Sequence, residues 1–462
     1  MLSVAENALL TKTGPGTIMG DLIRQYWVPA LLPSEVPAPD CPPVRVRLLG
    51  ENLIAFRTTA GKVGLIQDAC PHRAASLFFG RNEEDGIRCV YHGWKFDITG
   101  QCLDMLSEPE DSDFASKVKA RAYPCIEKAG IVWTYMGPGK SPPPFPDIEV
   151  LLLAERDTSI KPRVTMMDVN WFQAIENNVD TAHQGILHYG SIPLDTAMDI
   201  EKAASAVGNR NWAQDLKWIV ANRAPEFFIR DIDAGVTYAA KRPGDPGTSY
   251  WRTQHMLFPF YTMSPVPRIG TQLSVTITVP IDDEHCLSWS ISANLAGSTP
   301  AGANPSVPGG VAGNVPNSPD WLGRFRWGPF QEAASTGFDF GIDREKQSSD
   351  KTIQGYSGLP SVPVQDRAIV WSQGTTVDRS TEHLATTDSA IIRVRRRLLD
   401  AAKALRQRGM MPPGVSEPEA YRIRSGWAHL PEGVDYWEGL RELREEWALE
   451  ESEPLAPLPS VS

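Results

Sequence analysis

The chain has 462 residues, of which 42% are hydrophobic and 22% charged, which is typical of a globular protein with room for two or three domains. Its formal net charge of -11 disfavours nucleic acid and anionic membranes as partners, because both reward an excess of lysine and arginine. Since it has neither a signal-peptide pattern nor a run of about 18 apolar residues, we expect a soluble, cytoplasmic protein without a membrane span.

Short β-strands are predicted for the first third of the chain. Residues 45–66 alternate apolar and polar side chains between turn signals, and further short runs of this kind follow. The proline-rich stretch 137–149 then forces an extended connection. We expect a small all-β domain at 40–145, with residues 1–39 as an N-terminal arm packed on it.

A second, larger domain is expected at 150–450. Residues 169–188 carry apolar side chains at helical intervals and predict a helix that is interrupted near Gly185. Alternating runs then predict a large antiparallel sheet between about 205 and 297, so the fold class is α+β.

The rest of this domain contains one long loop and one strong helix. Residues 297–319 are rich in Gly, Pro, Ser and Asn and predict a mobile, lid-like loop. A helix is predicted at 387–408, with Gly409 as its stop. The tail 451–462 is expected to be flexible. Four arginines of the helix are interpreted as a solvated face: Arg393, Arg395, Arg396 and Arg397.

Two short motifs near residue 80 pair each of two cysteines with a histidine. They are Cys70-x-His72 and Cys89-x-x-His92. A structural zinc site is one interpretation, since zinc takes four Cys and His ligands. The mixed pairs instead favour a 2Fe-2S cluster in which two thiolates hold one iron and two imidazoles the other.

The other four cysteines have a simpler interpretation. They are too sparse and scattered for a disulfide framework, so reduced thiols are expected. We interpret them as small buried hydrophobes: Cys41, Cys102, Cys125 and Cys286.

The stretch from Cys70 to about residue 97 resembles the Rieske 2Fe-2S domain at the N-terminus of Rieske non-heme iron oxygenases. Gly93 and Trp94, directly after the second motif, would provide a tight turn and an apolar cover for the cluster. One departure from the family pattern is Ala74, where many relatives have glycine. It leaves all four ligand positions in place and bears only on the local backbone.

A second pair of histidines, His183 and His188, lies beyond the proline-rich stretch. Five residues turn an ideal helix by about 500°, so both rings reach one metal only where the helix bends or unwinds, and Gly185 offers that freedom. Two histidines and one carboxylate suit non-heme iron that activates dioxygen. Asn177-x-x-Asp180-x-x-His183-x4-His188 is similar to the iron motif of the family, in which Asp180 would link the iron to the cluster.

The third iron ligand is implied by the resemblance and not by spacing. The segment around "VPVQDRAIVW" resembles the C-terminal part of the phthalate 4,5-dioxygenase type, and this implies Asp366 as the ligand. Asp343 and Glu345 remain weaker alternatives. Asp378 and Asp388 are interpreted as a turn residue and a helix-start residue.

The resemblance covers the chain from about residue 25 to 408. It implies the oxygenase (alpha) subunit of an aromatic ring-hydroxylating system, with a Rieske domain and a helix-grip catalytic domain that holds Fe(II). It also implies a homotrimer, because the cluster and the iron of one chain lie too far apart for electron transfer.

The same resemblance implies the partners. Electrons would come from a separate flavin and 2Fe-2S reductase that oxidises NAD(P)H, and O2 would be the cosubstrate. The substrate would be an aromatic carboxylate, hydroxylated or oxidatively O-demethylated. Its anionic group should meet an arginine, for which the candidates are Arg210, Arg223, Arg230 and Arg252. The alternative is a Rieske electron-transfer protein, which the chain length disfavours.

Overall fold

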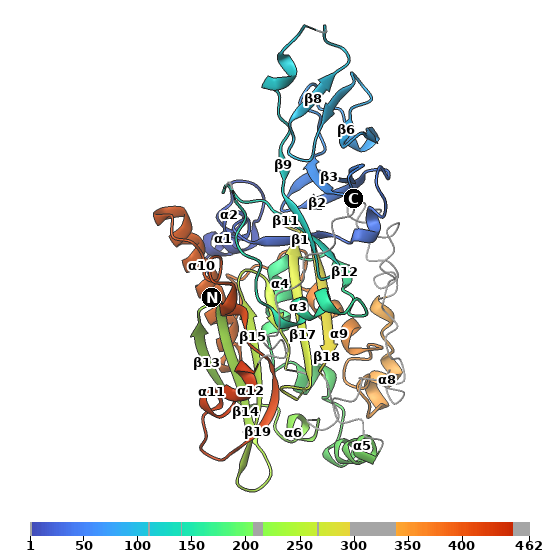
Figure 1. The fold of residues 1–462 in the computed structure, drawn as a ribbon. Helices are drawn as coiled ribbons and strands as arrows, with labels where there is room; N and C mark the ends of the chain where they lie inside the picture. Colours follow the sequence, from blue (N-terminus) through green and yellow to red (C-terminus); the bar gives the residue numbers. More distant parts are fainter. Residues whose placement is uncertain are drawn as a thin grey trace.

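The computed structural model has a small β part above a larger part that is built around one broad sheet (Figure 1). The predicted loop 297–319, the predicted tail 451–462 and Arg210 lie outside the residues that it describes. The described residues are 2–109, 111–139, 141–206, 216–265, 268–295 and 339–446.

The small part contains two four-stranded antiparallel sheets, which confirms the prediction of short strands. One sheet has the order β2-β3-β4-β9 and the other the order β5-β6-β7-β8. The strands of the first are β2 (Val44–Leu48), β3 (Glu51–Arg57), β4 (Val63–Gln67) and β9 (Ala122–Tyr123). The strands of the second are β5 (Arg81–Glu83), β6 (Gly86–Arg88), β7 (Trp94–Phe96) and β8 (Cys102–Met105).

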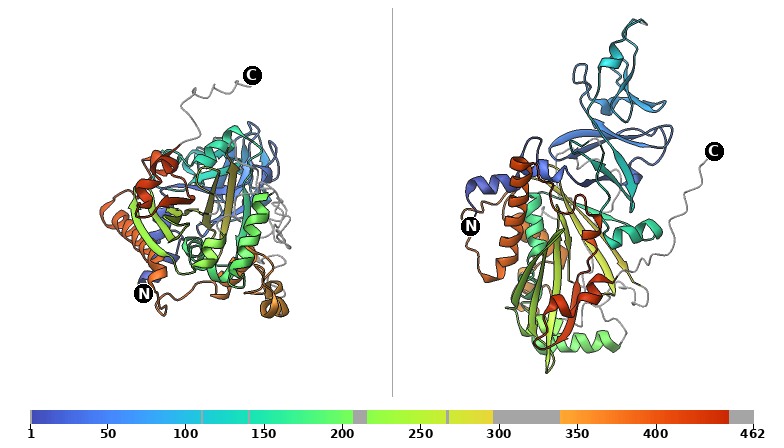
Figure 2. Two further views of the ribbon diagram at one scale, coloured as in Figure 1. Left: turned by 90° about the horizontal axis from the view of Figure 1, so that it is seen from below. Right: turned by 60° about the vertical axis from the view of Figure 1, so that its left-hand side comes forward.

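The N-terminal residues do not pack on the small β part alone, which corrects the expectation for 1–39. Helices α1 (Val4–Thr11) and α2 (Ile18–Ile23) contact α10 (Ser389–Arg408) of the larger part (Figure 2). The reason is hydrophobic, since α2 buries Leu22 and Ile23 completely. The chain then enters β1 (Trp27–Leu31), which forms a three-stranded sheet with β11 (Ile131–Tyr135) and β10 (Cys125–Lys128).

The larger part is built on the predicted antiparallel sheet, which has eight strands in the order β12-β18-β17-β16-β15-β14-β13, with β19 paired to β15. Two strands, β12 and β19, lie outside the predicted range, because each is isolated in the sequence and pairs with a distant strand. The strands are β12 (Arg163–Met167), β13 (Glu226–Ile232), β14 (Gly235–Pro243), β15 (Thr248–Leu257), β16 (Tyr261–Met263), β17 (Gln272–Pro280), β18 (Cys286–Asn294) and β19 (Gly426–Pro431).

Helices flank this sheet. Helix α10 confirms the helix predicted at 387–408, and Gly409 ends it in the left-handed conformation with φ 66°. The other helices among the described residues are α3 (Glu149–Arg156), α4 (Trp171–Val179), α5 (Leu194–Ala206), α6 (Leu216–Ala221), α8 (Arg344–Ser349), α9 (Val362–Ser372), α11 (Tyr436–Gly439) and α12 (Arg441–Glu445). No helix in the described part of the chain is long and apolar enough to cross a membrane.

The arginines of α10 do not form a solvated face, contrary to the expectation. Arg395 is 4% exposed and donates hydrogen bonds of 2.6 Å to both Glu176 and Glu382. Arg393 and Arg397 both bind Asp231 on β13. Most of their acidic partners are distant in sequence, so the local sequence pattern cannot predict these contacts. Among the four arginines, Arg396 is exposed, as expected.

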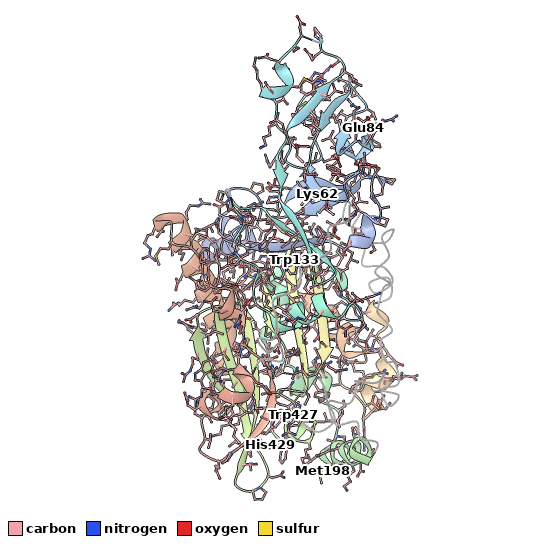
Figure 3. All side chains as sticks on the ribbon, in the orientation of Figure 1. Lys62, Glu84, Trp133, Met198, Trp427 and His429 are labelled. Atoms are coloured by element: carbon pink, nitrogen blue, oxygen red, sulfur yellow. The ribbon has the colours of Figure 1, made fainter. Side chains whose placement is uncertain are left out.

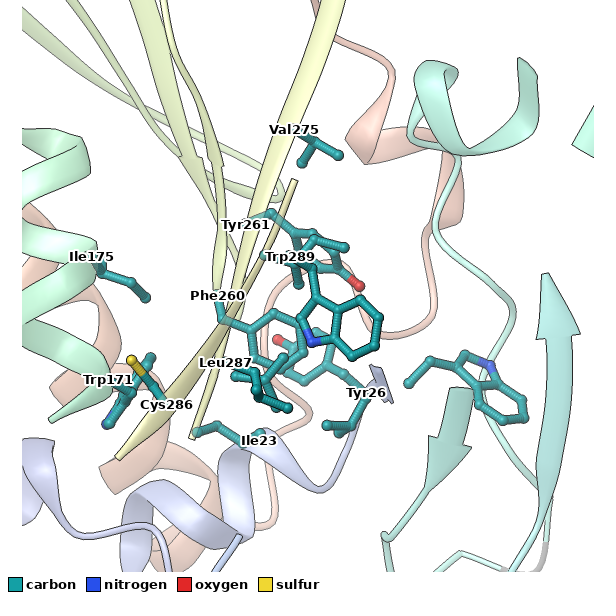
Figure 4. Packing of buried hydrophobic residues seen from close by; sticks show 14 of the residues in the cluster. Ile23, Tyr26, Trp171, Ile175, Phe260, Tyr261, Val275, Cys286, Leu287 and Trp289 are labelled. Carbon is teal, nitrogen blue, oxygen red and sulfur yellow. The ribbon is translucent and has the colours of Figure 1, made fainter. Parts of the chain in front are cut away.

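The core joins three segments that are distant in sequence. Ile23 and Tyr26 from the N-terminal segment pack with Trp289 and Leu287 of β18, close to Trp171 of α4 (Figure 4). Each large apolar side chain that is buried here stabilises the fold by about 1.5–3 kcal/mol. The core therefore holds α4 against the sheet.

The small and the large part are joined by backbone hydrogen bonds at the turn between β17 and β18. Leu49 N and Gly50 N donate to the carbonyl oxygens of Pro280 (3.1 Å) and Ile281 (2.8 Å). Fully buried Trp133 of β11 lies at the level where the two parts meet (Figure 3). The two parts therefore share a packed joint as well as the covalent connection.

His255 on β15 predicts a loss of stability at acid pH. Burial lowers the pKa of His255 to about 4, with Nε2 donating to the Arg424 carbonyl oxygen at 3.0 Å and Arg444 nearby. The folded protein keeps this ring neutral while the unfolded chain protonates it below about pH 6.5. As pH falls from about 6.5 to about 4, the folded state should lose roughly 3 kcal/mol through this residue.

We expect the melting temperature of His255→Gln to fall less between pH 7 and pH 5 than that of the wild type. Glutamine keeps a donor for the Arg424 carbonyl but cannot ionise. His383→Gln, at an exposed site, is the matched control and should behave like the wild type. An equal fall in all three proteins would contradict the assignment.

Candidate metal centres

The end of helix α4 determines where the two distal histidines lie. The helix ends at Asp180, which has φ -68° and ψ 120°. Asp180 Oδ1 then accepts from the backbone N–H of Ala182 (2.7 Å) and of His183 (3.4 Å), and a single π turn spans Gln184–His188. The predicted interruption exists, but it lies at Asp180 and not at Gly185, because the aspartate side chain replaces the helical hydrogen bonds.

Gly185 does not have the role expected of it, because its backbone conformation is one that any residue can adopt. It does not adopt a positive φ. An added Cβ there would approach the side chain of Arg223 to 3.4 Å. Arg223 Nε donates to the Gly185 carbonyl oxygen at 2.9 Å, and its Nη2 approaches further carbonyl oxygens of the following turn at 3.3 Å. A Cβ at 3.4 Å would be in ordinary van der Waals contact, so neither the backbone conformation nor the packing requires glycine at this position.

His183, His188 and Asp366 converge into one group. The Nε2 atoms of both histidines lie 3.4 Å from Asp366 Oδ1, and the ligand atoms of all three residues lie within 4.8 Å of one another. Across the described residues, this is the one group of three or more His, Cys, Asp or Glu side chains with that spacing. Asp366 comes from α9, so the fold brings together segments that are distant in sequence.

The alternative carboxylates serve other purposes. Asp343 Oδ1 accepts from the first turn of α8, at 3.0 Å from both Glu345 N and Lys346 N. Glu345 is exposed. Asp378 accepts from Ser380 N and Asp388 from Ala385 N, as expected for turn and helix-start residues.

The electrostatics of this group suit a bound cation. Asp366 Oδ1 is buried and has no hydrogen-bond partner, which is costly for a carboxylate unless a cation binds it. Burial opposes the charged form of His183, but the Asp180 and Asp366 carboxylates outweigh it and raise the pKa of His183 to about 9. Burial lowers the pKa of His188, and Asp366 offsets part of this effect. Two imidazoles and a carboxylate with open positions are the donor set of non-heme Fe(II).

Two matching loops in the small β part present the other four candidate ligands. Cys70 O accepts from Ala74 N at 2.9 Å, and Cys89 O accepts from Gly93 N at 2.9 Å. Ala74 and Gly93 both have positive φ, 59° and 77°. Ala74, the departure from the family pattern, therefore keeps the turn that glycine would make, at a cost of about 1–2 kcal/mol of backbone strain.

The four side chains of these loops lie together at the surface of the small part. Cys70 and Cys89 are buried, and burial together with the nearby Cys89 raises the pKa of Cys70 to about 11. The His72 and His92 rings lie 4.4 Å apart, and the Nδ1 atom of each is buried without a hydrogen-bond partner. Trp94 stacks on His72 at 4.3 Å, in the place expected for an apolar cover.

These four residues are not among the groups whose ligand atoms all lie within 4.8 Å, within the part of the chain that the structure describes. A single tetrahedral zinc would require such close spacing, because its ligand bonds are only about 2.0–2.3 Å long. A cluster with two iron atoms separates its two ligand pairs. The geometry therefore favours the cluster over zinc.

Comparison with known proteins identifies the family. Residues 26–120 match the Rieske [2Fe-2S] domain, and residues 330–453 match the "LigXa C-terminal domain like" family. The chain is 38% identical to the 3-chlorobenzoate-3,4-dioxygenase oxygenase subunit of Comamonas testosteroni, over 96% of this chain and 99% of that protein. The protein belongs to the Rieske non-heme iron oxygenases.

Further relatives of this Rieske oxygenase agree. It is 31% identical to the phthalate 4,5-dioxygenase oxygenase subunit of Pseudomonas putida, over 99% of this chain and 98% of that protein. The fold matches the terminal oxygenase of carbazole 1,9a-dioxygenase from Novosphingobium sp. KA1 with a TM-score of 0.52 at 20% identity, covering 88% of this chain and 97% of that chain. The interpretations as a zinc module and as a plain electron carrier are therefore wrong.

The arginine candidates of this Rieske oxygenase separate clearly. Arg252 on β15 is 3% exposed and lies on the same face as Gln254, whose Nε2 donates to Val179 O at 2.8 Å, the last residue of α4. The positive charge of Arg252 contributes to the lowered pKa of His188, after burial and the neighbouring His183. Arg230 instead stacks on Trp437 at 5.1 Å.

A cavity of about 420 Å³ also reaches Asp366. It lies between α4, α9, the edge strand β12 and the neighbouring strand β18, and Asn177, Arg163 and Arg367 are among its lining residues. Sequence reasoning singled out neither arginine. Arg163 lies on β12, a strand outside the predicted sheet range, and Arg367 lies on α9, whose approach to α4 is not visible in the sequence.

Proposed function

We propose that this Rieske oxygenase hydroxylates an aromatic carboxylate, with dioxygen and electrons from a separate NAD(P)H-dependent flavin and 2Fe-2S reductase. The observation that carries the proposal is the convergence of His183, His188 and Asp366 on a chain that also contains a Rieske domain. Fe(II) bound there supplies dioxygen activation, and the cluster supplies electrons. The names of the two relatives, a chlorobenzoate and a phthalate dioxygenase, support an aromatic acid as substrate.

The proposed ligands follow from the two groups. Cys70 and Cys89 would hold one iron of the cluster, and His72 and His92 the other. His183, His188 and Asp366 would hold the mononuclear iron. The buried Nδ1 atoms of His72 and His92 and the buried Oδ1 of Asp366, all without hydrogen-bond partners, support this assignment.

The proposed electron path crosses between subunits of a homotrimer. The Cys/His loops belong to the small part, and α4 and α9 belong to the larger part below it (Figure 1). Exposed apolar side chains flank both groups, as an interface requires: Tyr91 (57%) and Leu106 (69%) near the loops, and Ile186 (41%) and Trp371 (43%) near the iron group. Head-to-tail packing would place Asp180 between His183 and His92 of the partner subunit.

The proposed recognition of the substrate carboxylate falls to Arg252. It is buried on a sheet face that is directed at the end of α4, so its charge acts with little screening from water. A guanidinium matches a carboxylate with two parallel hydrogen bonds. A panel of chlorinated, methoxylated and dicarboxylic benzoates, supplied with a reductase, would identify the substrate through hydroxylated product or released formaldehyde. Formaldehyde would indicate O-demethylation in place of ring hydroxylation.

We expect Asp366→Ala to lose the mononuclear iron and all turnover while keeping the colour of the cluster. Elemental analysis should give about three irons per chain for the wild type and about two for the variant. His183→Ala and His188→Ala should also lose the mononuclear iron. Asp378→Ala is the matched control and should keep about three irons per chain. Full iron in Asp366→Ala would refute the assignment of Asp366 as the carboxylate ligand.

Asp180→Asn should slow the transfer of electrons to the iron by orders of magnitude. The amide keeps the size of the side chain but removes the anionic acceptor that lies 3.6 Å from His183 Nδ1. We expect the variant to fold, to keep its cluster and to retain most of its iron. The measurement is single-turnover oxidation of the reduced cluster with substrate and oxygen; a wild-type rate would rule out the bridge.

Arg252→Met should weaken binding of the aromatic acid about 10- to 100-fold, the loss expected for a charge-assisted hydrogen bond. Binding of the corresponding neutral amide should change little. Arg163→Met, in the cavity beside Asp366, is the matched control and should bind like the wild type. If only Arg163→Met weakened binding, the substrate would instead occupy that cavity.

A further inference from the structure

Gln365 is the buried neighbour of Asp366 on α9, and its amide has one possible orientation. Its side chain is fully buried. One end of the amide faces the carbonyl oxygens of Ile353 (2.7 Å) and Leu359 (3.4 Å). Carbonyl oxygens only accept hydrogen bonds, so this end must be the NH2 group. The amide oxygen, Oε1, must therefore face the other way.

The oriented amide determines the tautomer of His188. Gln365 Oε1 lies 2.7 Å from His188 Nδ1, and an amide oxygen can only accept. His188 Nδ1 therefore carries the proton and donates it. The lone pair of the neutral ring is left on Nε2, the atom 3.4 Å from Asp366 Oδ1.

We propose that Gln365 is a positioning residue of the mononuclear site: through its oxygen it holds His188 in the Nδ1-protonated, neutral form and directs Nε2 to the metal. This inference rests on the proposed function, because it assumes that His188 is a ligand. The backbone carbonyls of Ile353 and Leu359 fix the orientation of the amide, and the amide fixes the tautomer and orientation of the His188 ring.

The two histidines of the site thus receive different support. The Nδ1 atom of His183 lies 3.6 Å from the carboxylate of Asp180, whereas that of His188 faces a neutral amide. A carboxylate increases the basicity of the imidazole it contacts. A neutral acceptor fixes the tautomer of the ring without adding a negative charge. Such a charge would be costly here, because His188 is only 3% exposed.

Two substitutions distinguish the loss of the hydrogen-bond acceptor from a change in packing. Gln365→Met has a similar shape but offers no strong acceptor for Nδ1–H. Gln365→Glu keeps an acceptor oxygen, and its second oxygen can carry a proton for the Ile353 carbonyl. Gln373→Met, at the exposed end of the same helix, is the matched control.

The test is titration of the protein, its cluster intact and its mononuclear metal removed, with Co(II) and Fe(II). We expect Gln365→Met to bind both ions about 10- to 100-fold more weakly and to show altered Co(II) visible bands. Gln365→Glu and Gln373→Met should stay within about threefold of the wild type. Melting temperatures of the metal-free proteins and the absorption of the cluster report whether each variant is folded.

The outcomes are distinct. Wild-type affinity in Gln365→Met would overturn the inference, and so would equal weakening in Gln365→Met and Gln365→Glu, because the acceptor would then not matter. If Gln365→Met did not fold, Gln365→Glu with an altered Co(II) spectrum and weakened binding would overturn it, and Gln365→Glu with wild-type values would support it. Failure of the wild type itself to bind Co(II) would refute the ligand assignment of the proposed function and not the role of Gln365 alone.

Discussion

The end of helix α4 at Asp180 is the constraint on which the group of His183, His188 and Asp366 depends. A continued helix would leave His183 and His188 about 140° apart around its axis, too far to face one atom. The Asp180 side chain accepts the backbone N–H groups of Ala182 and His183 and so supplies the turn that the helix gives up. The same carboxylate faces His183 Nδ1, so one residue both ends the helix and orients a candidate ligand.

A helix end can position a metal group only if the helix itself is held firmly. Glu176, one turn before Asp180, accepts from Arg379 and Arg395, which are 0% and 4% exposed. Arg379 also donates to Asn7 of α1, which ties the N-terminal helix to the same network. A buried ion pair adds little net stability because its charges lose their hydration. Breaking one is costly, however, so the network favours a single position of α4 over any alternative.

The sequence predicts the parts of this enzyme whose geometry is local. The Cys70 and Cys89 loops are short turns, and their ligand spacing alone indicated a cluster. Asp366 could be assigned only by family resemblance, because nothing in the spacing shows that α9 approaches α4. The contact of Gln365 with His188 could not be predicted, because the fold brings the two residues together from distant parts of the chain. Arg223, a candidate for the substrate carboxylate, instead donates to backbone carbonyls, which any residue carries. The expectations for the N-terminal helices and for the arginines of α10 were wrong because the partners of these residues are distant in sequence.

The two sides of the group of His183, His188 and Asp366 differ in exposure and in charge. This difference suits the proposed arrival of electrons on one side and of substrate on the other. The side chains of His183 and Asp180 are 19% and 26% exposed, with the carboxylate on the outer side, where another subunit can approach. On the other side, His188 is 3% exposed, and Gln365, which contacts its Nδ1 atom, is uncharged and fully buried. On the proposed function, an electron that arrives from another subunit would reach the anionic, partly exposed side formed by Asp180 and His183. On the inner side, the buried hydrogen bonds of Gln365 to His188 and to the Ile353 carbonyl would keep a bound metal in one position relative to the substrate.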